Sequence, residues 1–163
     1  MIDLTRGVRR AERAVTDKQW IEQVLREGQI LSLALATPHA RPYVVPMGYG
    51  YEDSRIYLHG AAEGLKKELA EANPCVCFNV SIDAKLVRKE TGSGFTYHYR
   101  SVTGFGTIRT LSALEEKNAA LACLMRQYDG PHTDLTEQNH NAVWVAEIEI
   151  ERMTGKTNGY PGA

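Results

Sequence analysis

The sequence predicts a mainly β protein, an antiparallel barrel with helices packed around it. Short apolar segments recur along the 163 residues and are joined by tight turns. Helical spacing is confined to three segments that alternate with strands. The first three strands also follow one another too closely for the crossover helices that parallel strands need. An antiparallel sheet is therefore favoured over a doubly wound parallel one.

The elements are expected in the order helix, three strands, helix, two strands, helix, strand. Their expected ranges are 17–27, 30–37, 42–51, 55–59, 61–72, 75–82, 97–111, 113–128 and 143–150. The polar segment 83–94 and the turn-rich tail after residue 152 are expected to lie outside regular structure. The chain has no internal repeat and no linker, which predicts one domain over residues 1–163.

Local signals set the ends of these elements. Thr16 can cap the first helix, with Gln19 at the capping-box position, and Gly28 ends it. Asn73-Pro74 stops the second helix, and Ser112 is expected to cap the third. A turn at 37–39 separates the first two strands.

The segment 42–51, PYVVPMGYGY, does not have the composition of an ordinary interior strand. Its two prolines and two glycines interrupt the ladder of hydrogen bonds. Such a strand is predicted to carry a bulge or an unpaired edge at which something else docks.

Composition excludes several classes of function. The net charge is -1, with 19 basic and 20 acidic residues, which gives no support to a nucleic-acid or membrane-surface role. No segment approaches the length of a membrane span, and the first residues lack the apolar run of a signal peptide. Together with three cysteines, an odd number, this predicts a cytoplasmic protein.

The cysteines and histidines do not form a metal motif. Cys75 and Cys77 share one face of an expected strand, but no second pair stands at metal-site spacing, so both are interpreted as buried small hydrophobes. Cys123 is expected in the core. The histidines at 39, 59, 98, 132 and 140 also lack metal spacing, and no metal site is predicted.

Residues 55–67, RIYLHGAAEGLKK, form the first candidate site. A strand runs into a helix through His59-Gly60-Ala61, where small residues let a ligand approach the backbone. Free N–H groups at a helix start attract anions, and Lys66 lies one turn in. The pattern predicts a phosphate site or, alternatively, an ordinary strand–helix turn with surface lysines.

Residues 96–109, TYHYRSVTGFGTIR, form the second. Tyr97, Tyr99 and Ser101 alternate with His98 and Arg100 on opposite faces of a strand. Aromatic surface beside a guanidinium suits a planar, phosphorylated ligand, although a structural tyrosine pair with a surface arginine fits as well. No Ser/His/Asp triad, Cys/His dyad or HExxH motif is present. If the protein is an enzyme, a cofactor is expected to carry the reactivity.

At these stretches the sequence resembles the FMN-binding split-barrel superfamily typified by pyridoxamine 5'-phosphate oxidase, and within it the 5-nitroimidazole reductase (Nim) group. The matching pieces are collinear over nearly the whole chain. They include TDKQWIEQVLREG, RPYVVPMGYGY, RIYLHGAAEGLKKELAEANPCVCF, YHYRSVTGFGTIR and EIEIERMTGKTNG. The tail lacks a counterpart of the oxidase's C-terminal Trp-and-Arg substrate motif, which argues against vitamin B6 oxidation.

The resemblance implies a split β-barrel homodimer with FMN at the subunit interface. The isoalloxazine ring would lie along the backbone of one strand, and the ribityl chain and phosphate would reach the next strand–helix junction. Further contacts would come from the second stretch, in the same or the partner chain, and Trp144 would cover the ring from across the dimer. The implied FMN-binding residues are Val45, Pro46, Met47, Gly48, His59, Gly60, Ala61, Lys66, Tyr99, Arg100, Ser101 and Trp144.

His59 matches the histidine characteristic of the Nim group, and beside a flavin it would suit proton delivery to a reduced substrate. A purely structural role is the alternative. The implied function is a flavin-dependent reductase of small-molecule electron acceptors such as nitro-aromatics. A non-catalytic FMN- or haem-binding module, with His59 and His98 as candidate axial ligands, is the competing hypothesis.

Overall fold

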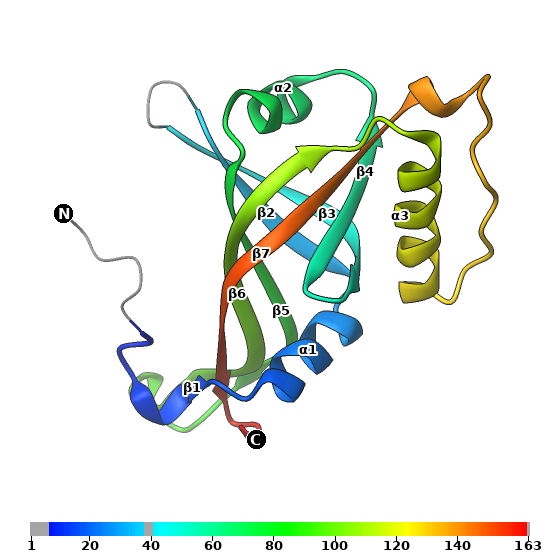
Figure 1. Cartoon of the computed structure of the whole chain (residues 1–163). Coiled ribbons are helices and arrows are strands. Elements are labelled where there is room, and N and C mark those ends of the chain that lie inside the picture. The colour runs from blue at the N-terminus through cyan, green and yellow to red at the C-terminus, as the bar shows by residue number, and fades with distance from the viewer. Residues whose placement is uncertain (1–6, 38–40, 163) are drawn as a thin grey trace.

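The computed structural model describes residues 7–37 and 41–162. Within these residues, seven strands form one antiparallel sheet in the order β1-β7-β4-β3-β2-β5-β6, and pairing between β6 and β7 closes it into a barrel (Figure 1). The strands are β1 (Ala14–Val15), β2 (Ile30–Ala36), β3 (Pro42–Glu52), β4 (Arg55–Ala61), β5 (Cys75–Val87), β6 (Thr96–Thr110) and β7 (Val143–Asn158). The helices are α1 (Lys18–Glu27), α2 (Leu65–Ala72) and α3 (Leu114–Gln127). The predicted fold class is confirmed. The predicted elements occur in the predicted order, but the short strand β1, which precedes α1, was not predicted.

Alternation along the strands builds the core. In β2 and in the first half of β5 every second side chain is buried, so leucines and bulky residues from neighbouring strands meet inside the barrel. The helices close the gaps: α1 and α2 lie at opposite ends of the barrel, and α3 lies against one side (Figure 1). Fully buried residues include Leu31, Leu33, Ile56, Leu58, Phe78, Val80, Val102 and Ile148.

The β3–β4 hairpin is paired over only part of its length. Asp53 and Ser54 form its turn, both with positive φ, as the tight hairpin turns require. Pairing then extends from Glu52↔Arg55 to Tyr49↔Leu58 and stops. Beyond that point the two strands have different partners, because residues 42–48 pair with β2 and residues 59–61 pair with β7. Among the described strands, none pairs with the second edge of residues 42–48, which we call the β3 edge.

The prolines of β3 explain why this edge is tolerated. The Tyr49 N–H donates to the Tyr128 hydroxyl, on the side away from β4, and alternation turns the backbone of residues 42, 44, 46 and 48 toward the unpaired side. Pro42 and Pro46 therefore stand where no ladder partner exists, and their missing N–H groups cost no hydrogen bond. The expected unpaired edge is present. The expected bulge is not, since the β2–β3 register runs unbroken.

Two helix caps differ from the prediction. Asp17, not Thr16, caps α1, and its carboxylate accepts a hydrogen bond from the Trp20 N–H at 2.7 Å. The cap position of α3 is Ala113, one residue after Ser112, with no side-chain cap. The turn expected at 37–39 lies partly outside the described residues.

Two strands are longer than predicted by five residues or more. β5 continues to Val87 through a register shift next to Asp83, whose φ of 56° absorbs the extra residue. β7 continues to Asn158, so most of the supposed turn-rich tail is strand, paired with β6 and β1. Gly155 belongs there because a Cβ would meet the Val15 carbonyl oxygen at 2.9 Å. No helix in the described ranges is long and apolar enough to cross a membrane.

Candidate functional site

The candidate site lies where the end of β4 meets β7 and α2. Gly60 pairs directly with Trp144 of β7, and Lys66 reaches back from α2 over both. The Lys66 Nζ lies 5.6 Å from the centroid of the Trp144 ring, a cation–π distance. A Cβ built on Gly60 would meet that Nζ at 2.7 Å. Glycine at 60 thus leaves the space that the ammonium occupies.

Lys66 has no acidic partner in the described part of the chain. Its side chain is half-buried, and burial lowers its pKa. The adjacent Lys67, by contrast, forms an ion pair with Glu71 at 2.8 Å. A partly desolvated ammonium without a counter-ion is stabilised by any anion that reaches it. Of the two lysines, Lys66 is therefore the one whose charge is available to bind a phosphate.

The helix start adds donors to the same place. The sequence predicted a helix from residue 61, but α2 begins at Leu65, after a Gly64 with φ of 117° that other residues rarely adopt. Gly64 stands at the cap position and has no side chain that could cap the helix. Among residues 7–37 and 41–162, the first-turn N–H groups have no side-chain capping partner, and they lie beside the Lys66 ammonium. Lys66 is the second residue of α2, closer to the helix start than predicted.

His59 and Ala61 flank Gly60 at the end of β4, and both side chains are exposed. Opposite them runs the β3 edge. There Val45 is half-buried, Pro46 exposed, Met47 buried and Gly48 half-buried. The edge turns backbone groups of alternate residues outward, so a flat polar ring alongside it would find hydrogen-bonding groups without displacing a strand.

Trp144 is only 2% exposed, and its indole N–H donates to the Thr110 hydroxyl at 3.0 Å. The indole is a floor beneath Lys66 within its own chain. The role that the resemblance implies for Trp144, covering the flavin from across a dimer, stays a prediction.

Comparisons with known proteins agree with this architecture. The family model for pyridoxamine 5'-phosphate oxidase matches residues 17–157. The chain belongs to the pyridoxamine 5'-phosphate oxidase family. A search of curated protein sequences finds no match.

Several solved structures are similar to this member of the family. A candidate 5-nitroimidazole antibiotic resistance protein from Bacteroides thetaiotaomicron is 31% identical, with a TM-score of 0.78, over 88% of this chain and 85% of that one. An FAD- and haem-binding protein from Mycobacterium smegmatis is 17% identical, with a TM-score of 0.81, over 93% and 76%. The flavocytochrome Anf3 from Azotobacter vinelandii is 21% identical, with a TM-score of 0.82, over 99% and 77%. The last two show the fold alone.

In this family member, a single chain does not bring Tyr99, Arg100 and Ser101 of the second stretch to Lys66. Arg100 binds Asp83 at 2.5 Å and also Glu27, so its guanidinium is already neutralised beside α1. Thr110, next to Trp144, stands ten residues further along β6, roughly 30 Å of strand. Tyr99 and Ser101 share the Arg100 end, and the buried Ser101 hydroxyl donates to the Lys156 carbonyl oxygen. Any contact of Tyr99, Arg100 or Ser101 with a ligand at Lys66 would have to involve another chain.

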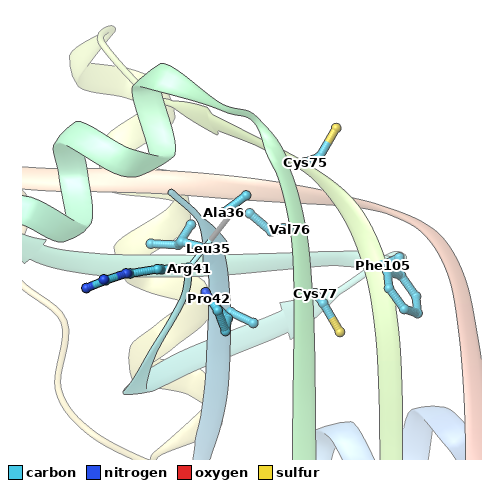
Figure 2. Close-up of a pocket in the computed structure, with 9 residues that line it drawn as sticks. Leu35, Ala36, Arg41, Pro42, Cys75, Val76, Cys77 and Phe105 are labelled. Carbon is cyan, nitrogen blue, oxygen red and sulfur yellow. The ribbon is translucent and has the colours of Figure 1, made fainter. Parts of the chain in front are cut away.

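An apolar groove that sequence reasoning missed lies on the outer face of the barrel (Figure 2). Its volume is about 320 Å³. Cys75 is exposed and Cys77 is half-buried, so the prediction that both are buried is wrong, whereas Cys123 is buried as expected. The signal was available in CVCFNV: the bulkier Val76, Phe78 and Val80 face inward and the cysteines outward. The groove is lined by Ala34, Leu35, Ala36, Arg41, Pro42, Cys75, Val76, Cys77 and Phe105.

The four histidines in the described part of the chain do not gather in one place. His59 is at the Lys66 end of the barrel, whereas His98 pairs with Lys85 at the Arg100 end and packs edge-on against Tyr160. In the ranges 7–37 and 41–162, no three His, Cys, Asp or Glu residues come together as metal ligands.

Proposed function

We propose that the protein binds FMN, with the phosphate at Lys66 and the isoalloxazine ring along the β3 edge. The observation that carries this proposal is the half-buried Lys66 ammonium, which has no carboxylate partner in the described residues and lies beside uncapped N–H groups at the start of α2. Gly60 leaves the space for that ammonium. The family and the flavin-binding neighbours support the choice of a flavin.

The proposed activity is reduction of small acceptors such as nitro-aromatics, with electrons from a two-electron donor such as a nicotinamide. The bound flavin would supply the redox chemistry. The chain itself binds the phosphate through Lys66 and orients the ring along the β3 edge. The exposed imidazole of His59 supplies a proton to the reduced acceptor, because imidazole can act as a general acid.

A comparison of FMN with riboflavin tests the binding mode, because the two ligands differ only in the phosphate. Replacement of Lys66 by Met should weaken FMN by about 1.5–3 kcal/mol, the value of a charge-assisted hydrogen bond, and leave riboflavin affinity unchanged. Lys85→Met, which removes an exposed lysine at the far end of the barrel, is the matched control. Equal FMN affinity in wild type and Lys66→Met would show that the phosphate binds elsewhere.

The visible spectrum of the purified protein separates the cofactors. Flavin bands support the proposal, a Soret band supports the haem-binding alternative, and no uptake of either cofactor contradicts both. Turnover of a nitroimidazole with NAD(P)H then tests the reductase role. His59→Gln should lower that turnover by a larger factor than it weakens FMN binding.

We further propose that the protein works as a homodimer and that the outer face around the groove is the contact surface. Ile30 and Val44 are exposed by 62% and 58%. Val44 pairs with Ala34 of the groove, and Ile30 lies on the same outward face of β2 as Ala34. Exposed apolar surface of this kind is typical of an interface. Val44→Glu should convert the dimer to monomer in sedimentation experiments. Phe95→Glu, at an exposed apolar residue outside this face, should not.

A further inference from the structure

A continuous chain of hydrogen bonds joins the floor of the Lys66 site to α2. The Trp144 indole N–H donates to the Thr110 hydroxyl at 3.0 Å, and that hydroxyl donates to Glu71 Oε1 at 3.1 Å. The other carboxylate oxygen of Glu71 accepts from the Lys67 ammonium at 2.8 Å. The four residues come from β7, β6 and α2, so the chain links the helix to two strands.

This link adds to a small packing contact between α2 and the barrel. The helix has eight residues, of which only Leu69 and Ala70 are buried. It follows Gly64, whose positive φ is a backbone conformation that residues other than glycine rarely adopt. Glu71 follows Lys66 by five residues, about 7.5 Å along the helix axis. Fixing Glu71 against the end of β6 therefore fixes where the Lys66 ammonium lies over Trp144.

The same chain of hydrogen bonds determines which groups the Glu71 carboxylate near Lys66 binds. Both oxygens of Glu71 are engaged, one by Thr110 and one by Lys67, and these hydrogen bonds lower the pKa of its carboxyl. The Glu71 carboxylate is thus engaged by Thr110 and Lys67 and not by Lys66. Of the two side chains that bind Glu71, Lys67 belongs to α2 itself, whereas Thr110 belongs to β6.

We propose that Thr110 and Glu71 are positioning residues for the anion site at Lys66. They fix the position of α2 relative to Trp144 and keep the Glu71 carboxylate bound to Lys67. The inference rests on the proposed phosphate site at Lys66. It adds two residues that touch no ligand and that no sequence motif identifies.

The first experiment compares FMN and riboflavin binding in Thr110→Val, which keeps the shape of the side chain and removes both hydrogen bonds. FMN affinity should fall by about threefold to tenfold, as expected for the loss of one or two modest hydrogen bonds, and riboflavin affinity should stay constant. Thr110→Ser, which retains the hydroxyl, should restore FMN binding. Thr107→Val is the matched control, because it removes a similar Thr–Glu hydrogen bond from the same strand, to Glu151.

A merely structural role for Thr110 would weaken both flavins equally, and that result would overturn the proposal. Failure of Thr110→Ser to rescue would overturn it as well. The proposal is also overturned if the ratio of the FMN and riboflavin dissociation constants is the same in Thr110→Val as in wild type.

The second experiment needs no flavin and separates this inference from the proposed function. NMR of the flavin-free protein should show faster exchange of the Trp144 indole proton in Thr110→Val. The Trp20 indole, which donates to the Pro161 carbonyl oxygen, should be unaffected and serves as the internal reference. The Lys66 Cε resonance should also titrate at a different pH from wild type. If wild type binds no flavin, the proposed function fails while these signals still decide the inference; an unchanged Lys66 titration would refute it.

Discussion

Substitution of Gly60 by Ala tests whether the space above Trp144 is built for the Lys66 ammonium. The added methyl would lie 2.7 Å from Lys66 Nζ and 3.2 Å from its Cε, while ordinary contacts between such atoms are about 3.5–4.0 Å. The ammonium must therefore move by about 1 Å. The third neighbour, Trp144 Cε3 at 3.5 Å, is already at an ordinary contact distance, so the fold itself need not adjust.

The magnitude follows from how narrow a charge-assisted hydrogen bond is. Such bonds span about 2.7–2.9 Å, and a displacement of 1 Å removes much of the 1.5–3 kcal/mol that one contributes. FMN binding to Gly60→Ala should weaken by about 1–2 kcal/mol, or about 5- to 30-fold. Stability should hold or rise, because replacing a strand glycine by alanine contributes about 0.5–1 kcal/mol in the folded state's favour.

The assay is fluorescence titration with FMN and riboflavin, together with thermal unfolding of the flavin-free protein. Gly92→Ala is the control, since nothing among the described residues lies within 4 Å of a Cβ at that position. The reasoning is refuted if Gly60→Ala binds FMN as tightly as wild type. It is also refuted if FMN and riboflavin weaken by the same factor, or if the variant loses stability while Gly92→Ala does not.

Three further outcomes follow from the structure. A Cβ at Gly104 would overlap the buried ring of Phe78, so Gly104→Ala should lower stability by about 1–3 kcal/mol in urea unfolding, and an unchanged midpoint would contradict this packing. Burial raises the pKa of the Cys123 thiol to about 11; alkylation of the native protein at pH 8 followed by mass spectrometry should modify exposed Cys75 and spare Cys123, and equal labelling would contradict the assignment. Lys117 is buried and donates to two backbone carbonyl oxygens that precede and begin β7, so Lys117→Met should cost about 1–3 kcal/mol, and a neutral effect on unfolding would show that water replaces the ammonium.

Much of the fold was predictable because it depends on local patterns. Alternation in β2 and β4 and the helical spacing of α1 and α3 appear directly in the sequence, and the tight spacing of the first strands excludes parallel pairing. Local patterns failed where composition and structure conflict. The Gly- and Thr-rich end of β7 has the composition of a turn, yet it pairs with β6 and β1, because long-range partners supply hydrogen bonds that no local signal reveals.

The candidate site divides in the same way. The strand–helix junction with Gly60 and Lys66 is local, and the sequence indicated it, although the helix starts four residues later than predicted. Arg100 resembled a second anion ligand until the fold placed it beside Glu27 and Asp83. Glu27 is far from Arg100 in the chain, so no motif could show that the guanidinium is already paired.

By itself, the sequence determined an antiparallel β protein with an interrupted strand at 42–51 and a possible phosphate turn ending at Lys66. Only the tertiary structure decided that the prolines lie on an unpaired edge and that Trp144 forms a buried floor under Lys66. It also decided that Lys67, and not Lys66, takes the carboxylate of Glu71. The physical reason is that pairing, burial and counter-ions depend on which distant segments meet, whereas alternation and turn chemistry depend only on neighbours in the chain.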